Sequence, residues 1–440
     1  MTDALSPPAA YAAPLPPPAQ ARTRPFHTLA KPIGPACNLR CTYCFYLDKS
    51  ALFPSSASLR MPDDVLENFI RDYIRLQDAA EISFAWQGGE PTLLGVDFFR
   101  KVLTLQQRFA DGRPITNALQ TNATLIDDAW GEFLAEHGFL VGVSIDGPAE
   151  LHDSYRIDPR GGPSFARVRQ GIEKLKQHRV EFNTLTVVNR RNVKHPLKVY
   201  RFLKDIGARF IQFIPLVERE VDANRGGGLA SPPCPGERTR TRPAPWSVMP
   251  VAYGNFLTAI FDEWVREDVG STFVQLFDNA LGSWLGHGSS LCVFAETCGR
   301  AIAIEHDGSV YACDHYVYPQ YRLGRLGERT LANMVDSPAQ RKFGADKSDT
   351  LPAYCRRCEF RFACHGECPK HRFLDTPDGE PGLNYLCAGY RHFFRHIDPY
   401  MRKMAELLRQ QRPAAQIMAL ARQWQGRPPR TGRPPPPTRS

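Results

Sequence analysis

The sequence contains no apolar run of about 18 residues, so we expect no membrane-spanning helix. Its first 25 residues are rich in proline and alanine, but they have no continuous apolar stretch and their arginines lie at the wrong end for a secretory signal. No repeat of solenoid length recurs along the chain. These absences argue against a membrane protein, an exported precursor and a repeat array, and we expect a cytoplasmic protein.

The folded body of the protein also lacks an excess of charge, although the whole sequence has a net charge of +9. Residues 407–440 contain seven arginines and no acidic residue. Residues 1–25 and 222–245 carry the remaining positive charge, which leaves the rest of the chain near neutral. Because basic tails are usually solvated, we expect neither a nucleic-acid partner nor a membrane partner.

Three segments have too little apolar content to fold alone. Residues 1–24 are expected to form a disordered proline-rich tail, and residues 222–245 form a Pro/Gly/Arg-rich insertion. The third segment is residues 426–440, the proline-rich end of a region at 401–440 that is expected to form a C-terminal helix and a basic proline-rich tail. The tails therefore lie outside the predicted folded domains, and the insertion interrupts the first of them.

Between these segments, short apolar runs alternate with helical patterns, as in a parallel α/β sheet whose two faces are both covered. The pattern predicts strands at 27–33, 81–87, 115–121, 139–145, 180–188 and 208–214. It predicts helices at 62–77, 96–110, 126–137, 164–178 and 193–206, with a further helical region at 250–285. Six such units indicate an α/β fold with a partial (β/α)6 TIM-like barrel over residues 25–287. A small cysteine-rich domain is expected over residues 288–400.

Three closely spaced cysteines follow the first predicted strand in the pattern CxxxCxxC: Cys37, Cys41 and Cys44. A [4Fe–4S] cluster usually takes four cysteines, so three ligands leave one iron open to bind another molecule. A zinc site is the alternative, but zinc usually takes four ligands and no fourth ligand lies nearby in the sequence. The pattern therefore favours an iron–sulfur cluster with an open iron.

The cysteine-rich region contains eight further cysteines, enough for two fully ligated four-iron clusters. Two zinc sites remain the alternative, since spacing alone does not distinguish them. The twelfth cysteine, Cys234, lies in the insertion and is expected to be a bystander. The eight are Cys292, Cys298, Cys313, Cys355, Cys358, Cys364, Cys368 and Cys387.

Polar residues follow the predicted strands at the barrel edge where active sites form. Glu90, in the sequence Gly88-Gly89-Glu90-Pro91, could bind a cationic amine. Asn122, Ser144 and Asp146 follow the next two strands and could bind hydroxyl groups, and Arg156 could bind a carboxylate. Loop capping and a surface salt bridge are the structural alternatives.

Asp314 directly follows one of the cysteines, Cys313. A carboxylate beside a cluster ligand is well placed to act as a general base. The structural alternative is a turn aspartate that accepts backbone N–H groups. His315, His365 and His371 also lie near cysteines, and we interpret them as structural.

Together these motifs resemble those of radical S-adenosylmethionine (SAM) enzymes with a SPASM domain, and in more detail those of the anaerobic sulfatase-maturating enzymes. The resemblance covers residues 27–400 except the insertion. It rests on Cys37–Tyr46, Gln87–Thr92, Leu119–Asn122, Ser144–Pro148 and Asp307–Asp314. Two features depart from the family pattern: Asn122-Ala123 stands where Asn-Gly is common, and the insertion has no obvious counterpart.

The resemblance implies three [4Fe–4S] clusters and SAM as cofactors. The open iron of the first cluster, held by Cys37, Cys41 and Cys44, would bind SAM, with further contacts from Gly88, Gly89, Glu90, Asn122, Ser144 and Arg156. The first auxiliary cluster would be held by Cys292, Cys298, Cys313 and Cys368, and the second by Cys355, Cys358, Cys364 and Cys387. The resemblance also assigns Asp314 as the catalytic acid–base and places Gln87 and Tyr46 near the target side chain.

The implied activity is oxidation of a Cys or Ser of a sulfatase to formylglycine through a 5′-deoxyadenosyl radical. Asp314 would remove the thiol or hydroxyl proton while the nearer auxiliary cluster accepts an electron. The implied partners are an unfolded sulfatase polypeptide and a flavodoxin- or ferredoxin-type electron donor, and a monomer is expected. One alternative is a SPASM-type maturase that crosslinks or oxidises another peptide. An alternative from another class is a zinc-stabilised nucleic-acid-binding protein.

Overall fold

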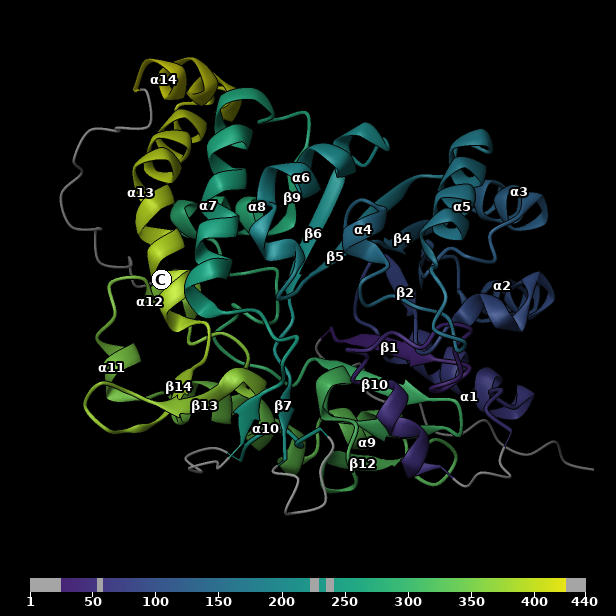
Figure 1. Ribbon diagram of the computed structural model, residues 1–440. Helices are drawn as coiled ribbons and strands as arrows, with labels where there is room; N and C mark the ends of the chain where they lie inside the picture. The colour runs from purple at the N-terminus through teal and green to yellow at the C-terminus, as the bar shows by residue number, and fades with distance from the viewer. Residues whose placement is uncertain (1–24, 54–57, 222–228, 235–240, 425–440) are drawn as a thin grey trace, which may run out of the picture.

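Six parallel strands form the centre of the computed structural model, which describes residues 25–53, 58–221, 229–234 and 241–424 (Figure 1). All six lie at the predicted places, and each pairs in parallel with the next along the chain. The strands are β1 (His27–Lys31), β2 (Ile82–Trp86), β3 (Ile115–Thr121), β4 (Leu140–Ser144), β5 (Phe182–Val188) and β6 (Phe210–Pro215).

Amphipathic helices connect these strands and bury their apolar faces against the sheet. An aromatic cluster of Phe69, Phe84, Trp86 and Phe99 joins the first two helices to β2. The predicted last helix begins three residues late, because Pro196 starts it after a short 3-10 turn. The helices are α1 (Asp63–Leu76), α2 (Val96–Phe109), α3 (Asp128–Glu136), α4 (Ala149–His152), α5 (Phe165–Gln177) and α6 (Pro196–Asp205).

The sheet continues across the boundary that we predicted at residue 288. Strand β10 (Ala301–Glu305) pairs in parallel with β1 along its whole length, from His27 opposite Ala301 to Lys31 opposite Glu305. Strands β11 (Ser309–Tyr311) and β12 (Arg322–Arg325) extend it by antiparallel pairing, and β9 (Phe273–Val274) extends the other edge beside β6. The result is a ten-stranded sheet in which the cysteine-rich region shares hydrogen bonds with the barrel.

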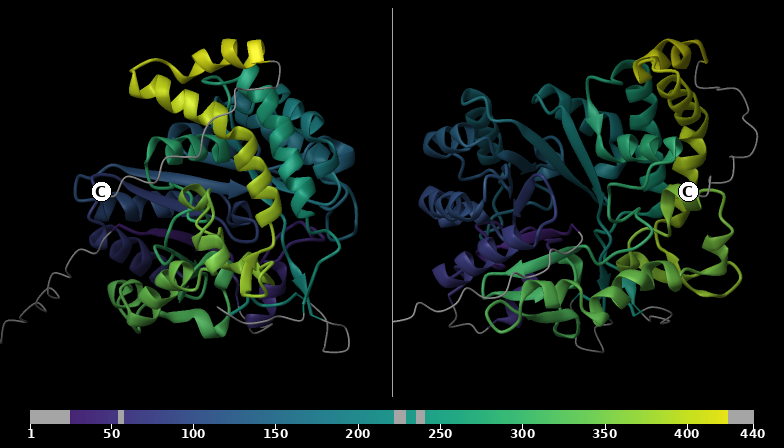
Figure 2. Two further views of the ribbon diagram at one scale, coloured as in Figure 1. Left: turned by 90° about the vertical axis from the view of Figure 1, so that its left-hand side faces the viewer. Right: turned by 180° about the vertical axis from the view of Figure 1, so that it is seen from behind.

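The cysteine-rich region otherwise consists of short helices and strands (Figures 1 and 2). A two-stranded sheet lies within it, β13 (Arg372–Asp375) with β14 (Pro381–Asn384). Its helices are α9 (Leu331–Val335), α10 (Pro338–Asp349), α11 (Ala353–Arg356) and α12 (Arg361–Cys364). None of the helices in the described ranges is both long and apolar enough to cross a membrane.

The predicted insertion is only partly described, and residues 222–228 and 235–240 lie outside the described residues. At its base, β7 (Arg219–Glu220) pairs with β8 (Arg242–Pro243). Arg219 donates a hydrogen bond to Thr241 at 2.8 Å, and its guanidinium lies 5.1 Å from the ring centroid of Phe373. The base of the insertion is therefore packed against the cysteine-rich region, which its composition did not indicate.

The predicted helical region at 250–285 forms two helices, α7 (Pro250–Glu267) and α8 (Gln275–Leu285). Helix α7 packs along α13 (Cys387–Arg409), and α14 (Ile417–Trp424) follows at the end of the described chain (Figure 2). The two long helices approach closely at Gly254 and Gly389, where a Cβ on Gly254 would lie 2.6 Å from the carbonyl oxygen of Gly389. Because α13 begins at Cys387, this contact fixes the position of that cysteine.

We expect Gly254→Ala to lower the free energy of unfolding by about 1–3 kcal/mol, because the added methyl group meets backbone and the helices must separate. Urea denaturation of the purified protein measures the change. The matched control is Gly282→Ala in α8, where a Cβ would meet nothing within 4 Å. That variant should gain stability by about 0.5–1 kcal/mol. Equal effects of the two substitutions would contradict the close approach of α7 and α13.

Candidate active site

The loop after β1 brings Cys37, Cys41 and Cys44 together. It is anchored on the segment after α4 by backbone hydrogen bonds from Arg40 to Ile157 and from Thr42 to Tyr155, at 2.7 and 2.9 Å. Burial raises the pKa of Cys37 to about 11 and that of Cys41 to about 12, and the neighbouring thiols of the loop add to both shifts. A metal binds the thiolate form, so cluster binding at this loop releases protons.

Two cations lie beside these thiols. Burial raises the pKa of Cys44, while the N–H groups of Tyr46 and Leu47 and the charges of Arg156 and Lys31 act to lower it. Donors and cations of this kind stabilise negative charge on sulfur. The donor set thus fits an anionic iron–sulfur cluster with three thiolate ligands.

The Gly-Gly-Glu turn after β2 passes directly against the cysteine loop. The N–H of Gly89 donates to the carbonyl of Gly34 at 2.7 Å, and that of Glu90 donates to Ala36 at 2.8 Å. A Cβ on Gly89 would lie 1.9 Å from the Ala36 carbonyl oxygen, so only glycine fits there. This close approach explains why the sequence has glycine at this position.

The carboxylate of Glu90 is buried and already accepts several hydrogen bonds. Its donors are the N–H and hydroxyl of Thr92 at 3.0 and 2.6 Å, the Thr121 hydroxyl at 2.7 Å and the Asn122 N–H at 2.7 Å. Glu90 therefore joins the turn after β2 to the end of β3. Its expected contact with the amine of SAM stays a prediction.

Asn122 lies against the cysteine loop, and both the nitrogen and the oxygen of its side-chain amide form hydrogen bonds. Its nitrogen donates to Asn38 at 2.9 Å and lies 3.8 Å from the Cys37 sulfur, while its oxygen accepts from Thr124. The next residue, Ala123, adopts a left-handed conformation with φ 59°. The loop therefore keeps a backbone conformation that glycine favours, although alanine occupies the position.

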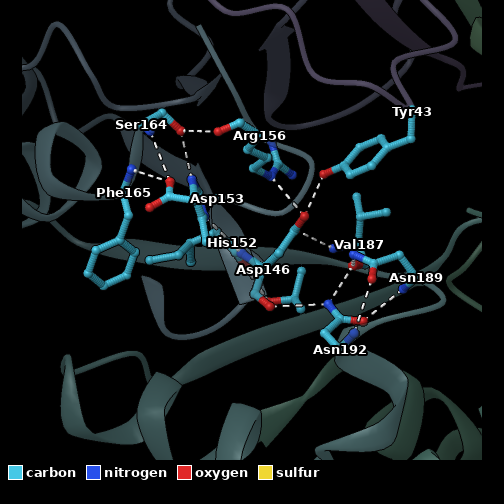
Figure 3. A network of polar contacts seen from close by, with 12 residues as sticks. Tyr43, Asp146, His152, Asp153, Arg156, Ser164, Phe165, Val187, Asn189 and Asn192 are labelled. Atoms are coloured by element: carbon cyan, nitrogen blue, oxygen red, sulfur yellow. Dashed lines mark hydrogen bonds and ion pairs between the residues drawn. The ribbon is translucent and has the colours of Figure 1, made fainter. Parts of the chain in front are cut away.

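Arg156 is paired with Asp146 in the interior, so it is not the surface salt bridge of the structural alternative (Figure 3). Its Nε lies 3.1 Å from an Asp146 oxygen that also accepts the Tyr43 hydroxyl at 2.6 Å. The other Asp146 oxygen accepts the Val187 N–H at 3.0 Å. Asp146 thus fixes Arg156 beside the cysteine loop. Ser144 is buried at the end of β4, two residues before Asp146, and its expected contact with SAM stays a prediction.

Figure 3 also shows a serine, a histidine and an aspartate in the same network. His152 contacts the Ser164 hydroxyl at 3.0 Å, but that hydroxyl donates to the Arg156 carbonyl and the histidine is fully buried. Asp153 accepts the N–H groups of Ser164 and Phe165 rather than orienting the histidine. The three residues support the backbone around Arg156 and do not form a hydrolytic triad.

The eight cysteines of the C-terminal region fall into groups of electrostatic neighbours. Cys313 interacts with Cys292 and Cys298, and Cys368 interacts with Cys313 and Cys298. Burial raises the pKa of each of these thiols. Cys368, which is distant in sequence from the other three, is thus near the group that the resemblance implies.

A second group lies between α11, α12 and the start of α13. Cys355 and Cys364 each interact with Cys358 and Cys387. The described ranges include all twelve cysteines, and within them no three His, Cys, Asp or Glu side chains gather as tightly as one metal ion requires. Thiolates that surround a four-iron cluster lie further apart than the ligands of a single ion.

Asp314 faces the barrel rather than capping a turn. Its carboxylate forms an ion pair with Lys31, at the end of β1. Burial acts to raise the pKa of Asp314, but Lys31, His315 and Lys370 outweigh it and leave the pKa below its ordinary value. The group is therefore an ionised carboxylate, the form that a general base requires.

Tyr46 lies beside this ion pair, and the backbone of Gln87 is bonded to the residue that precedes Lys31. The ring of Tyr46 lies 3.6 Å from the Lys31 nitrogen, and its hydroxyl donates to both oxygens of Glu305 at 2.6 and 2.7 Å. Gln87 follows β2, and its N–H donates to the Ala30 carbonyl at 2.9 Å. The site thus combines residues that end or follow β1, β2 and β11.

Comparisons with known proteins agree with this architecture. Residues 32–203 match the Radical SAM superfamily, and residues 292–359 match the SPASM iron–sulfur cluster-binding domain. The chain is 48% identical over 398 residues to a serine-type anaerobic sulfatase-maturating enzyme of Bacteroides thetaiotaomicron, covering 90% of this chain and 95% of that protein. The chain belongs to the anaerobic sulfatase-maturating enzymes.

Two further matches within the family have a different target type. A cysteine-type anaerobic sulfatase-maturating enzyme of Clostridium perfringens is 35% identical over 87% of this chain and 98% of its own length. A solved structure, native anSMEcpe with bound AdoMet and Cp18Cys peptide, matches with a TM-score of 0.75 and 34% identity over 87% of this chain and 99% of that chain. The prediction of a radical SAM enzyme with a SPASM domain is confirmed.

Sequence patterns missed two residues of this sulfatase-maturating enzyme site, Lys31 and Glu305. Both are almost fully buried, and they lie opposite each other at the ends of β1 and β10. Each is a charged residue that ends an apolar strand, a signal that was present in the sequence. The sequence alone did not show that Lys31 and Glu305 are neighbours, because only the pairing of β1 with β10 places them together.

Proposed function

We propose that this enzyme oxidises a serine side chain of a sulfatase polypeptide to formylglycine, and that it accepts cysteine less well. One observation carries the proposal: Asp314, from the SPASM region, lies beside the cysteine loop of the barrel through its ion pair with Lys31. The preference for serine rests on similarity, since serine-type relatives are 40–48% identical and the cysteine-type relative of C. perfringens is 35% identical.

Three cysteine sets would hold the cofactors, as the resemblance implies: Cys37, Cys41 and Cys44; Cys292, Cys298, Cys313 and Cys368; and Cys355, Cys358, Cys364 and Cys387. When bound, the three [4Fe–4S] clusters and SAM supply the 5′-deoxyadenosyl radical and accept the last electron. As the resemblance implies, SAM would be bound beside the cysteine loop by Gly88, Gly89, Glu90, Asn122, Ser144 and Arg156, and Glu90 also fixes the turn after β2.

The protein's own residues then have distinct roles. Tyr46 and Gln87 would orient the target side chain next to Asp314. Conversion of a CH2OH group to an aldehyde removes one hydrogen atom, one proton and one electron, and Asp314 would accept the proton at its carboxylate. A buried, ionised carboxylate suits this task because it accepts a proton without rearrangement of solvent. A cysteine target would give a thioaldehyde, which water converts to the same aldehyde with release of hydrogen sulfide.

The partners of the proposed reaction are an unfolded sulfatase polypeptide and a flavodoxin- or ferredoxin-type electron donor. Crosslinking of another peptide is the competing outcome for the same architecture. A carboxylate, rather than a further thiol ligand, beside Cys313 favours dehydrogenation over crosslinking.

The test is incubation of the anaerobically reconstituted enzyme with SAM, a reductant and two sulfatase peptides that differ only in Ser or Cys at the target position. Mass spectrometry should detect the aldehyde from both, with faster formation from the serine peptide. Faster oxidation of the cysteine peptide would refute the preference for serine. A crosslinked product, or no product from either peptide, would refute formylglycine formation.

A further inference from the structure

Lys31 is a lysine in the protein interior, with 2% of its surface exposed. It ends β1, directly opposite Glu305 of β10. A lysine is almost never buried to this extent unless its charge is paired. The burial of Lys31 between the barrel and the SPASM region therefore requires a partner for its ammonium group.

The ammonium group of Lys31 contacts two residues that come from different parts of the chain. It forms an ion pair with the Asp314 carboxylate, and it lies 3.6 Å from the centroid of the Tyr46 ring. Tyr46 is held independently at its other end, since its hydroxyl donates to both oxygens of Glu305. Lys31 therefore links the base from the SPASM region to an aromatic residue that follows the cysteine loop.

We propose that Lys31 is a positioning residue, which holds Asp314 and Tyr46 in a fixed mutual arrangement. This arrangement lets Asp314 remove a proton from each target side chain that has lost a hydrogen atom. The inference rests on the proposed function, because it assumes that Asp314 receives the proton of the target side chain. It assigns no contact between Lys31 and the substrate.

The surroundings of Asp314 show why its position depends on Lys31. His315 and Lys370 also lie within electrostatic range of the carboxylate. Lys370 is already paired with Glu218, and its ammonium group lies 4.6 Å from the Phe45 ring. Without Lys31, the carboxylate would keep only the attraction of His315 and Lys370, and the group that joins it to the Tyr46 ring would be lost. A shift of about 1 Å in such a group can cost about 100-fold in rate.

The test compares two products in the Lys31→Met variant, whose side chain has a similar length but no charge. We expect 5′-deoxyadenosine formation to fall far less than aldehyde formation, since Lys31 is one of several groups near Cys44, and the KM for the serine peptide to stay close to wild type. The kcat for aldehyde formation should fall by about 100-fold, so that most SAM cleavage becomes uncoupled from oxidation. Lys31→Arg, which keeps the charge, should restore part of the coupling.

Lys204→Met is the matched control. Lys204 also pairs with an aspartate, Asp268 at 2.8 Å, and lies 4.8 Å from a tyrosine ring centroid, that of Tyr200, but it belongs to α6 on the outside of the barrel. Loss of this pair should lower stability and leave the ratio of aldehyde to 5′-deoxyadenosine unchanged. The iron content of each variant is measured alongside, as a readout of folding that does not depend on turnover.

The outcomes separate the two claims. If wild-type enzyme forms no aldehyde, the proposed function fails. If wild-type enzyme forms aldehyde and Lys31→Met keeps the wild-type ratio of products, the positioning role is overturned. If Lys31→Met and Lys31→Arg both lose iron and 5′-deoxyadenosine formation together, Lys31 is a structural residue and the positioning role is overturned as well.

Discussion

Replacement of Cys41 by alanine is expected to abolish formation of 5′-deoxyadenosine from SAM. Two thiols remain in the loop, and Arg156 then faces a site that has lost a third of its ligand charge. A four-iron cluster held at only two positions is not retained during turnover. We expect a loss of about 1,000-fold or more, because the uncatalysed cleavage contributes almost nothing. Chromatographic measurement of 5′-deoxyadenosine after anaerobic reconstitution gives the result.

The matched control for this variant is Cys234→Ala, which removes the exposed cysteine at the insertion. That variant should form 5′-deoxyadenosine at the wild-type rate and bind the same amount of iron. Persistent SAM cleavage in Cys41→Ala would remove Cys41 from the proposed ligands. Equal losses in both variants would instead indicate general damage from cysteine replacement.

Asp314→Asn is expected to separate SAM cleavage from peptide oxidation. Asparagine has nearly the same shape and can still contact Lys31, so the site keeps its geometry. It does not accept a proton as a carboxylate does, so aldehyde formation should fall by about 100- to 10,000-fold. The formation of 5′-deoxyadenosine should continue. Parallel measurement of both products from one reaction gives the ratio directly.

Asp268→Asn is the control for this substitution, because Asp268 is a mostly buried aspartate that pairs with Lys204 away from the site. It should lower stability and leave the ratio of the two products unchanged. If Asp314→Asn formed the aldehyde at the wild-type rate, Asp314 would not be the base. A loss of both products would point to a role in cluster retention, since Asp314 is next to Cys313.

The strands and helices of the barrel were predictable because the apolar pattern of each element lies within its own short stretch of sequence. Strands β1 to β6 are short apolar runs in which at least every second central residue is buried, although Leu140, Phe210 and Ile214 are partly exposed, and the helices between them carry one apolar stripe each. The pairing of β10 with β1 was not predictable, since it joins segments about 270 residues apart through backbone hydrogen bonds that leave no periodic pattern. The predicted boundary therefore fell within a continuous sheet.

The candidate site shows the same division between local and distant information. The cysteine loop and the Gly-Gly-Glu turn are local motifs, and the structure places them in contact. The partners of Arg156 and Glu90 depend on the fold, so the sequence left their contacts open. Lys31 was missed for this reason, because its partner Asp314 follows the distant strand β11.

The central claim is that a hydrogen atom leaves the Cβ of the target serine and that the same event leads to formylglycine. A sulfatase peptide deuterated at that Cβ tests it most directly, with mass spectrometry of both 5′-deoxyadenosine and the peptide. We predict that deuterium appears in 5′-deoxyadenosine in proportion to the aldehyde formed. Aldehyde formation with no deuterium in 5′-deoxyadenosine would contradict the account.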